Sequence, residues 1–262
     1  MASTIPNQPD LQRKVIVVMP AYNAAKTLKK TVDELPRQEV TDIILVDDGS
    51  RDDTVEIAKT LGLTVFTHVR NFGYGANQKT CYAEALKAGA TIIVMVHPDY
   101  QYDPTLLPEL IHLIDQDKAD VVFGSRMMGV SAFQQGMPWW KYISNKFLTA
   151  VENWIFELSL SEFHTGYRAY SRKVLEQVDF RANSDKFIFD QEIVAQMVEC
   201  GLRITEVPVP VRYFPEASSA DLLDSIIYGL GILWLLLRYS LHRAGIWRSM
   251  QFVSHTSRYR SV

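Results

Sequence analysis

Short apolar runs and longer amphipathic segments alternate along the first half of the chain. An apolar run without polar alternation is typical of a strand buried on both faces of a sheet, whereas apolar residues at helical spacing indicate a helix with one buried face. The predicted strands and helices follow one another in the order 14–20, 24–35, 42–46, 51–61, 64–68, 76–88, 92–96, 104–115 and 119–123. Because they alternate through short connections, we expect an α/β fold with a wound, mostly parallel central sheet flanked by helices.

The second half of the chain is less regular. Residues 138–160 form an aromatic-rich helical segment, which predicts packing against something other than the sheet alone. Residues 163–172 are expected to be extended and residues 188–200 helical. The prolines in 204–211 predict an edge strand, since proline lacks the amide hydrogen that an inner strand needs.

Oxygen-bearing side chains follow the strand predicted at 92–96. Asp99 and Gln101 are two residues apart, so in extended backbone their side chains point the same way. In open α/β sheets, ligands bind just beyond the carboxyl ends of the strands. Carboxylate and amide oxygens suit a hard divalent cation, Mg²⁺ or Mn²⁺, which can in turn hold a diphosphate. The sequence therefore predicts a site where a nucleotide-sugar is held by its metal.

Three neighbouring features have simpler explanations. His97 is expected to be hydrogen-bonded to backbone rather than to ligate the metal, because imidazole suits softer metals than Mg²⁺. Asp103 precedes Pro104, which is typical of a helix N-terminus, so we expect Asp103 to cap that helix. Residues 73–75, Gly-Tyr-Gly, lack the full dinucleotide fingerprint and are expected to form a helix-capping loop.

The first two strands also end in polar residues. Asp47 and Asp48 precede Gly49, which permits a tight turn, so turn formation and helix capping explain the two acids taken alone. The first strand ends in Pro20, Ala21, Tyr22 and Asn23. Two adjacent strand ends then offer an aromatic ring and a carboxylate, which suit a nucleobase and its ribose hydroxyls.

Basic and acidic side chains later in the chain suit anionic groups and proton transfer. Arg126 follows the strand at 119–123 and is well placed for a phosphate. Lys141 and Asn145 lie one helical turn apart and could reach a second anionic group, the alternative being a solvated surface. Asp190 and Glu192 open a helix; one of these acids caps it and the other faces the pocket, and the sequence does not say which.

The bulk properties exclude some classes of function. The chain has 262 residues, 47% of them hydrophobic, which fits one large α/β domain or one domain with an appendage. Its net charge of −3 gives no reason to expect nucleic-acid binding. Cys81 and Cys200 lack metal-site spacing and are expected to be reduced thiols in a cytoplasmic protein. Residues 1–13 lack the apolar core of a signal peptide and are expected to be flexible.

The C-terminal segment begins with an apolar stretch, residues 226–237. A helix over 225–237 would be about 20 Å long, shorter than a hydrocarbon core of roughly 30 Å. Arginines and aromatic residues follow it without any acid: Arg238, Tyr239, Arg243, Trp247, Arg248, Phe252, Arg258, Tyr259 and Arg260. This pattern favours a peripheral anchor at the cytoplasmic face of a membrane, with a buried core helix and a true span as alternatives.

The polar motifs occur in an order that resembles one known family. They are VVMPAYN, VDDGSRDDT, NFGYGAN, the stretch around Asp99, VVFGSR, FHTGYRAYSR and FIFDQEI, and they span roughly residues 14 to 215. In this ordered set the chain resembles family-2 glycosyltransferases of the GT-A fold, and it is most similar to the polyprenyl-phosphate branch, the dolichyl-phosphate mannose synthase type. The expected regions are then a flexible N-terminus at 1–13, a glycosyltransferase domain at 14–218 and a membrane-interface helix with a basic aromatic tail at 219–262.

The resemblance implies roles for individual residues. The nucleotide pocket would be lined by Pro20, Ala21, Tyr22, Asn23, Asp47, Asp48 and Gly49. Asp99 and Gln101 would hold Mg²⁺ or Mn²⁺, and His97 stands where the family has the first aspartate of D-x-D, which should weaken cation binding or shift it towards Mn²⁺. The acceptor phosphate would be contacted by Arg126, Lys141, Asn145 and Arg168.

Three functions are compatible with these features. The first is an inverting transfer of a sugar from a nucleotide-diphosphate sugar to a polyprenyl phosphate, with Asp99 and Arg126 assisting the leaving group. The second is the same chemistry with a hydroxyl acceptor, which needs a base, and Asp190 is the candidate. The third is a binding module without turnover, suggested by His97. The nucleobase, the sugar and a possible homo-oligomer stay open.

Overall fold

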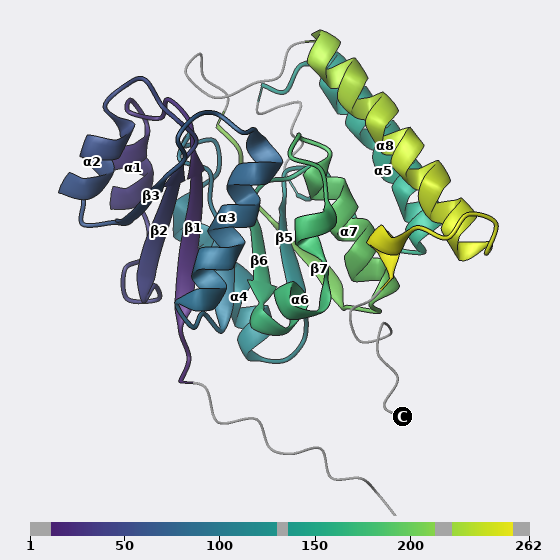
Figure 1. Cartoon of the computed structure of the whole chain (residues 1–262), viewed down its shortest axis with the longest axis horizontal. Helices are drawn as coiled ribbons and strands as arrows, with labels where there is room; N and C mark the ends of the chain where they lie inside the picture. Colours follow the sequence, from purple (N-terminus) through teal and green to yellow (C-terminus); the bar gives the residue numbers. More distant parts are fainter. Residues whose placement is uncertain (1–11, 130–135, 213–221, 254–262) are drawn as a thin grey trace, which may run out of the picture.

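The computed structural model describes residues 12–129, 136–212 and 222–253 and contains a seven-stranded sheet with helices on both faces (Figure 1). The strands lie in the order β3-β2-β1-β4-β6-β5-β7. Their bounds are β1 Val15–Ala21, β2 Asp42–Asp47, β3 Thr64–Thr67, β4 Ile92–Met95, β5 Val121–Ser125, β6 Arg168–Ser171 and β7 Ile204–Pro208. The α-helices are α1 Leu28–Asp33, α2 Thr54–Thr60, α3 Tyr74–Lys87, α4 Leu107–Asp115, α5 Trp139–Phe156, α6 Arg172–Gln177, α7 Phe189–Glu199 and α8 Leu222–Arg243.

The sheet is parallel except at β6, which runs antiparallel to both β4 and β5. The predicted mostly parallel α/β sheet is therefore confirmed, and β7 is an edge strand as predicted. The chain leaves the sheet at the carboxyl end of β5 and returns from α5 to the same edge, so β6 has to run in the opposite direction. The sequence predicted extended structure over 163–172, but β6 is shorter and α6, which was not predicted, begins at Arg172.

Each face of the sheet has its own hydrophobic core. In β1, Ile16 and Val18 contribute to the core beneath α3 and α7, whereas Val15 and Val17 contribute to the core beneath α1 and α4. This alternation follows from the two-residue period of a strand, and it explains why β1 is apolar throughout. Because both faces are covered, the carboxyl edge of the sheet is where polar groups of several strands can meet.

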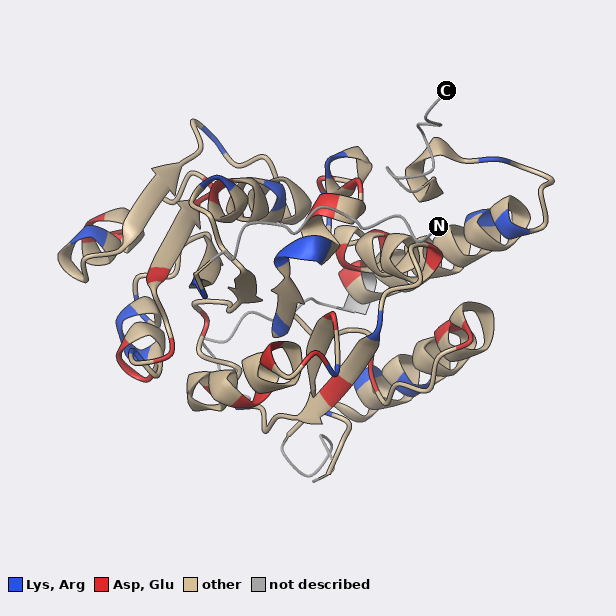
Figure 2. Cartoon of the chain, turned by 90° about the horizontal axis from the view of Figure 1, so that it is seen from below, with Lys and Arg blue, Asp and Glu red and all other residues tan. Residues whose placement is uncertain are grey.

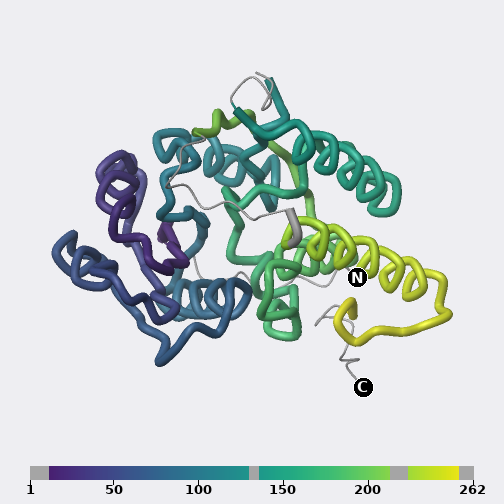
Figure 3. Tube along the Cα trace, turned by 90° about the horizontal axis from the view of Figure 1, so that it is seen from above, coloured from purple at the N-terminus to yellow at the C-terminus, as the bar shows by residue number. Residues whose placement is uncertain are grey.

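Helices α5 and α8 lie side by side and extend beyond the sheet (Figures 1 and 3). Helix α8 has 22 residues, so it is about 33 Å long and exceeds the predicted 225–237. By length and composition alone, it is the one helix in the described part of the chain that could cross a membrane, and 22% of its apolar stretch is buried. Its two arginines, Arg238 and Arg243, are in its C-terminal part (Figure 2).

Parts of the predicted terminal regions differ from expectation or lie outside the described residues. Within the predicted flexible N-terminus, Arg13 forms ion pairs with Asp115 and Glu39, at 3.0 and 3.1 Å, and residues 1–11 lie outside the described part. In the predicted interfacial tail, Tyr239 and Phe252 are buried in the core instead, with ring centroids 5.4 Å apart. The predicted boundary at 218/219 and the residues Arg258, Tyr259 and Arg260 are also outside the described residues.

Candidate functional site

A pocket of about 710 Å³ lies beyond the carboxyl ends of β1, β2 and β4. Four further segments complete its wall: the start of α3, the loop before β6, the residues around the start of α7, and the first turns of α8. The sequence-predicted residues in this lining are Pro20, Ala21, Tyr22, Asn23, Asp48, Asp99, Gln101 and Asp190. The predicted residues outside the lining are Asp47, Gly49, Arg126, Lys141, Asn145 and Arg168.

Asp48 joins the end of β2 to the loop that precedes α3. Its carboxylate accepts hydrogen bonds from the backbone N–H groups of Phe72 and Gly73, both at 2.9 Å, and lies 2.7 Å from His68 Nδ1. The ring of Tyr22, at the end of β1, remains 49% exposed at the pocket. At this end the pocket therefore offers an accessible aromatic ring beside a carboxylate that is already held by backbone donors.

Asp47 and Gly49 shape the turn rather than the pocket. Asp47 Oδ2 accepts hydrogen bonds from the N–H groups of Gly49 and Ser50, at 3.1 and 3.0 Å. Gly49 has φ 77°, and a Cβ there would lie 2.8 Å from the backbone of Arg70, so a side chain at this position would clash. The expectation that these two residues contact a nucleotide is not supported, because the turn explanation accounts for both.

The chain turns at Tyr100, between the two predicted metal-site residues. Tyr100 has φ 60°, and Asp99 Oδ1 accepts a hydrogen bond from the N–H of Gln101 at 3.0 Å. The predicted extended backbone is therefore wrong, although Asp99 and Gln101 both line the pocket. Cation–π contacts stabilise this turn, because Lys30 Nζ and Arg212 Cζ each lie 4.2 Å from the centroid of the Tyr100 ring.

The charge on the pocket wall favours a cation. Among the described lining residues there are four aspartates, Asp48, Asp99, Asp190 and Asp224, and no lysine or arginine. Burial raises the pKa of Asp99 above its ordinary value of 3.8 and outweighs the opposing effect of His97 and Arg126. A diphosphate entering such a wall needs a positive counter-charge, and a metal ion on Asp99 would remove the cost of its buried charge.

The donor atoms present suit a hard cation that is completed by its substrate. No group of three His, Cys, Asp or Glu side chains within the described ranges could enclose a metal ion. Asp99 and the neighbouring Gln101 would supply oxygen ligands, and phosphate oxygens and water would have to supply the others. This fits Mg²⁺ or Mn²⁺ held jointly with a nucleotide better than a closed structural metal site.

Tyr74 links the end of β4 to α7. Its hydroxyl donates to Asp190 Oδ2 at 2.7 Å and lies 3.2 Å from His97 Nε2, and its ring stacks on the imidazole with centroids 5.6 Å apart. His97 is thus paired with a side-chain hydroxyl and not with backbone as predicted. A Cβ on Gly166 would lie 2.4 Å from His97 Nε2, so this glycine is needed for the imidazole to fit.

Asp190 faces the pocket, which resolves the choice between the two acids of α7. Its Oδ1 accepts a hydrogen bond from Gln78 Nε2 at 2.9 Å, and Arg168 Nη1 lies 3.9 Å from the same oxygen. Glu192 instead accepts a hydrogen bond from the N–H of Ser184, in the segment that precedes α7. The hydrogen bonds from Tyr74 and Gln78 fix the direction of the Asp190 carboxylate at the pocket wall.

Arg168 is buried beneath the pocket instead of facing it. The residue is 1% exposed, and its guanidinium donates to the carbonyl oxygens of Phe163, Thr165 and Asp190 at 2.7–2.9 Å. The predicted contact with an acceptor phosphate is therefore not supported. Arg168 positions Asp190, because its Nη1 donates to the backbone carbonyl of that residue.

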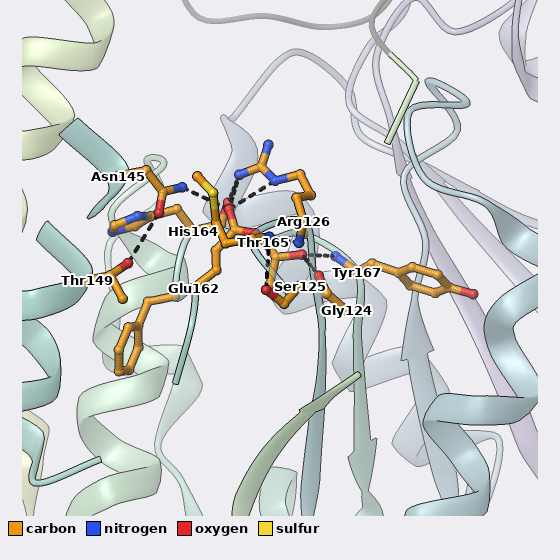
Figure 4. Close-up of polar contacts among 12 residues, drawn as sticks. Gly124, Ser125, Arg126, Asn145, Thr149, Glu162, His164, Thr165 and Tyr167 are labelled. Carbon is orange, nitrogen blue, oxygen red and sulfur yellow. Dashed lines mark hydrogen bonds and ion pairs between the residues drawn. The ribbon is translucent and has the colours of Figure 1, made fainter. Parts of the chain in front are cut away.

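Arg126 and Asn145 meet at a buried acid that the sequence analysis did not identify (Figure 4). Glu162 is fully buried and accepts hydrogen bonds from Arg126 Nε at 2.9 Å and Asn145 Nδ2 at 2.8 Å. Arg126 Nη2 also donates to the carbonyl of His164 at 2.6 Å. Lys141 lies one turn before Asn145 on α5, with Nζ 5.2 Å from the Trp140 ring centroid. This cluster lies beside the pocket, behind His164.

Helix α8 forms part of the pocket wall, which sequence reasoning missed. Asp224, Ser225 and Tyr228 line the pocket from the first turns of the helix. The Tyr228 hydroxyl accepts a hydrogen bond from Gln191 Nε2 at 3.0 Å, and its ring meets the imidazole of His164 edge-on. The signal was in the sequence, because polar residues at 224, 225 and 228 share one face of an otherwise apolar helix.

Solved structures with the same fold bind nucleotide and metal. Glucosyl-3-phosphoglycerate synthase from Mycobacterium tuberculosis, in complex with Mn²⁺, uridine diphosphate and glucosyl-3-phosphoglycerate, has a TM-score of 0.64 at 19% identity, over 93% of this chain and 86% of that one. The same enzyme with Mg²⁺ and uridine diphosphate has a TM-score of 0.65, over 90% and 81%. At this identity the likeness shows the GT-A fold.

Sequence comparisons identify the family. A UDP-N-acetylglucosamine–dolichyl-phosphate N-acetylglucosaminyltransferase from Methanococcus voltae is 27% identical over 85% of this chain and 94% of its own length. A polyprenol monophosphomannose synthase from Mycolicibacterium smegmatis is 26% identical over 75% and 77%. The profile of glycosyl transferase family 2 matches residues 16–179, most of the sheet and its pocket. The chain therefore belongs to glycosyl transferase family 2 and is a nucleotide-sugar-dependent glycosyltransferase.

Proposed function

We propose that this glycosyltransferase moves a sugar from a nucleoside diphosphate to a polyprenyl phosphate, with inversion at the anomeric carbon. The nucleotide would occupy the end of the pocket formed by Tyr22 and Asp48, with its diphosphate near Asp99. The acceptor would enter from the opposite end, beside α8. The activities of the relatives from Methanococcus and Mycolicibacterium support a lipid phosphate as the acceptor class.

One observation carries the proposal: α8 contacts the pocket and also bears an exposed apolar surface. Asp224, Ser225 and Tyr228 line the pocket, whereas Leu230 and Leu237 are 63% and 50% exposed. A helix that is polar towards the pocket and apolar towards the outside suits a substrate with a polar head and a hydrocarbon tail. A soluble acceptor would leave this apolar surface without a use.

The same surface supports peripheral binding to the cytoplasmic face of a membrane. Helix α5 extends it, because Phe147 and Trp154 are exposed beside α8. Lys146 on α5 and Arg243 on α8 could contact anionic lipid headgroups. Since the first turns of α8 line the pocket, hydrocarbon cannot surround the whole helix, and this favours a helix lying in the interface over one that spans the bilayer.

The chemistry requires positioning more than proton transfer. A phosphate monoester has a second pKa near 6, so at neutral pH its oxygen is already a nucleophile. The protein would hold that oxygen in line with the anomeric carbon and keep water out. A divalent cation on Asp99 and Gln101, when bound, would neutralise charge on the leaving nucleoside diphosphate.

The hydroxyl-acceptor alternative has one observation in its favour. Asp190 lines the pocket, and its carboxylate, held by hydrogen bonds from Tyr74 and Gln78, is a group that can act as a base. The lipid-phosphate function remains the better supported of the two, because it also uses the exposed apolar surface of α8.

An acceptor screen tests the proposal. Radiolabelled UDP- and GDP-sugars are incubated with the full-length protein, Mn²⁺ or Mg²⁺ and undecaprenyl phosphate in detergent, and label is measured in the lipid extract. We expect lipid-linked label with at least one donor, lost on addition of EDTA. Transfer to a soluble hydroxyl compound, with no labelled lipid for any donor, would eliminate the lipid-phosphate acceptor.

A further inference from the structure

A carboxylate in the interior of α5 lacks ordinary partners. Glu152 is fully buried, and neither of its oxygens accepts a well-aligned hydrogen bond from any described residue. Its Oε2 lies 2.9 Å from Nε2 of His164. A buried carboxylate is costly unless a cation or hydrogen-bond donors compensate it, so the imidazole is the group that compensates Glu152.

The nearby Glu162 is a buried acid whose charge is compensated by hydrogen-bond donors. It is equally buried, but it accepts hydrogen bonds from the N–H and the guanidinium of Arg126 and from Asn145. Removing the charge of Glu162 would leave these donors unpaired. Glu152 has His164 as its one ion-pair partner among the described residues, so its carboxylate has no evident purpose other than to act on this imidazole.

His164 connects Glu152 to the pocket. Its side chain lines the pocket wall at the end nearest α8, beside Tyr228, with ring centroids 5.9 Å apart. Within the described lining, His97 and His164 are the side chains that can carry a positive charge, and His97 Nε2 is already paired with the Tyr74 hydroxyl. With one nitrogen beside Glu152, His164 has its second nitrogen available for a ligand.

The position of His164 favours the acceptor over the donor. Tyr22 and Asp48 follow β1 and β2, on one side of β4, whereas His164 precedes β6 on the other side. Asp99, which follows β4, lies between them in the order of the sheet. A sugar held at Asp99 would therefore have its nucleotide on the β1–β2 side and its attacking group on the His164 side.

We infer that His164 binds the phosphate of the acceptor, and that Glu152 is the positioning residue that orients the imidazole and balances its positive charge. The inference rests on the proposed function, because it names a residue for the acceptor half of that site. In such an arrangement the imidazole donates a strong, charge-assisted hydrogen bond to the phosphate, and the buried acid fixes the direction of the ring.

The test compares acceptor and donor affinities in His164→Gln, Glu152→Gln and the double variant. We expect His164→Gln to raise the KM for undecaprenyl phosphate about 10- to 100-fold, as the loss of a charge-assisted hydrogen bond predicts. The Kd of nucleoside diphosphate with Mn²⁺ should change by less than about 2-fold. Glu152→Gln should raise the acceptor KM by a smaller factor, and the double variant should resemble His164→Gln, because the two residues act as one unit.

Two controls keep the result interpretable. Glu199→Gln makes the same acid-to-amide change on α7, where Glu199 meets Tyr239 and Arg243 away from the pocket, and it should leave both affinities unchanged. If His164→Gln fails to fold because Glu152 is left unpaired, the double variant removes that charge and still measures the acceptor KM.

Two results would overturn the inference: an unchanged acceptor KM in the folded double variant, or an equal loss of nucleotide affinity. Binding of a short-chain prenyl phosphate, measured as a Kd by calorimetry, separates this inference from the proposed function. If the wild type makes no lipid product but binds the prenyl phosphate through His164, the transfer reaction is wrong and the phosphate site stands. If it transfers sugar to lipid and His164→Gln binds the prenyl phosphate equally well, the phosphate site is wrong.

Discussion

At the β1–β2 end of the pocket, polar side chains are held mainly by backbone N–H groups, whereas at the α5–α8 end they are held mainly by one another. Asp48 accepts from the backbone of Phe72 and Gly73, while Glu162 accepts from the side chains of Arg126 and Asn145. Backbone donors come from neighbouring turns of the sheet edge. Side-chain pairs depend on how two helices and a loop pack together.

This difference suggests that the two ends change by different means. The β1–β2 end is built on strand ends, so its geometry follows from the sheet and tolerates little alteration. The α5–α8 end depends on a few buried charge pairs and an exposed apolar surface. Under the proposed function, exchanging those pairs would alter acceptor binding and leave the β1–β2 end unchanged.

The largest effect is expected at Asp99, which lies between the two ends. Asp99→Asn should lower activity by about 10³-fold, as the loss of a principal electrostatic group does. The same substitution should stabilise the metal-free protein at neutral pH, because burial raises the pKa of Asp99 and its charged form is disfavoured in the folded state. The measurements are turnover with Mn²⁺ and thermal unfolding in EDTA.

The sign of this stability effect follows from proton binding. Between the ordinary value of 3.8 and the raised pKa, the folded protein binds more protons than the unfolded chain, so stability falls as pH rises through that window. The gain from Asp99→Asn should therefore shrink towards zero when unfolding is measured below pH 3.8. A variant that is less stable than wild type at neutral pH would contradict this account of Asp99.

The next largest effect separates the two ends by membrane binding. Leu230→Glu with Leu237→Glu should weaken binding to anionic vesicles about 10- to 100-fold, because each exposed leucine would otherwise bury its side chain in lipid. Vesicle co-sedimentation measures it. Val69→Glu, at a 94% exposed position in the loop after β3, is the matched control and should bind as wild type does. Equal binding by all three proteins would remove the membrane role from α8.

A smaller effect is expected at Asp190 if the acceptor is a phosphate. Asp190→Asn should then lower kcat by about 10-fold or less, whereas a hydroxyl acceptor that needs a base would lose about 10²- to 10⁴-fold. Tyr74→Phe removes the hydrogen bond from the Tyr74 hydroxyl to Asp190 but keeps the Asp190 carboxylate. A large loss confined to Asp190→Asn would favour the hydroxyl acceptor, and a loss shared by both variants would report on the shape of the pocket.

The smallest effect concerns Asp120, which precedes β5 at the amino end of that strand, away from the pocket. Hydrogen bonds from Arg203 lower the pKa of Asp120 to about 2. The pair therefore stabilises the fold above pH 4, and this contribution is lost as pH falls from about 4 to about 2. Asp120→Asn should lower the free energy of unfolding by about 1 to 2 kcal/mol at pH 7, after allowance for solvent screening. Unfolding in urea measures it, and neither substrate KM should change.

The β1–β2 end was the more predictable half, for a physical reason. Strand ends and their turns are local, so Tyr22, Asp48 and Asp99 could be located from apolar runs and the residues that follow them. The α5–α8 end depends on contacts between residues far apart in the sequence, such as Arg126 with Glu162 and Glu152 with His164. Glu152 and Glu162 could not be distinguished from surface acids in the sequence, because the pattern of a helix does not show which other segment packs against it.

Two corrections show the same limit on a smaller scale. Arg168 belongs to a motif of the family, yet its guanidinium is buried against carbonyl groups, because β6 runs antiparallel and places this residue under the pocket. Tyr74 was expected in a capping loop, and Gly73 does cap α3, but the ring also reaches His97 and Asp190. In both cases the sequence motif gave the position of the residue in the chain, and the fold determined where its side chain points.

The most direct test of the account is a crystal structure with Mn²⁺ and a nucleoside diphosphate bound. We predict that the carboxylate of Asp99 would hold the metal ion next to the diphosphate, with the nucleobase beside Tyr22 and an open path from Asp99 to His164 and α8. A structure in which the Asp99 carboxylate points away from the nucleotide, or in which the nucleotide lies outside this pocket, would contradict the account.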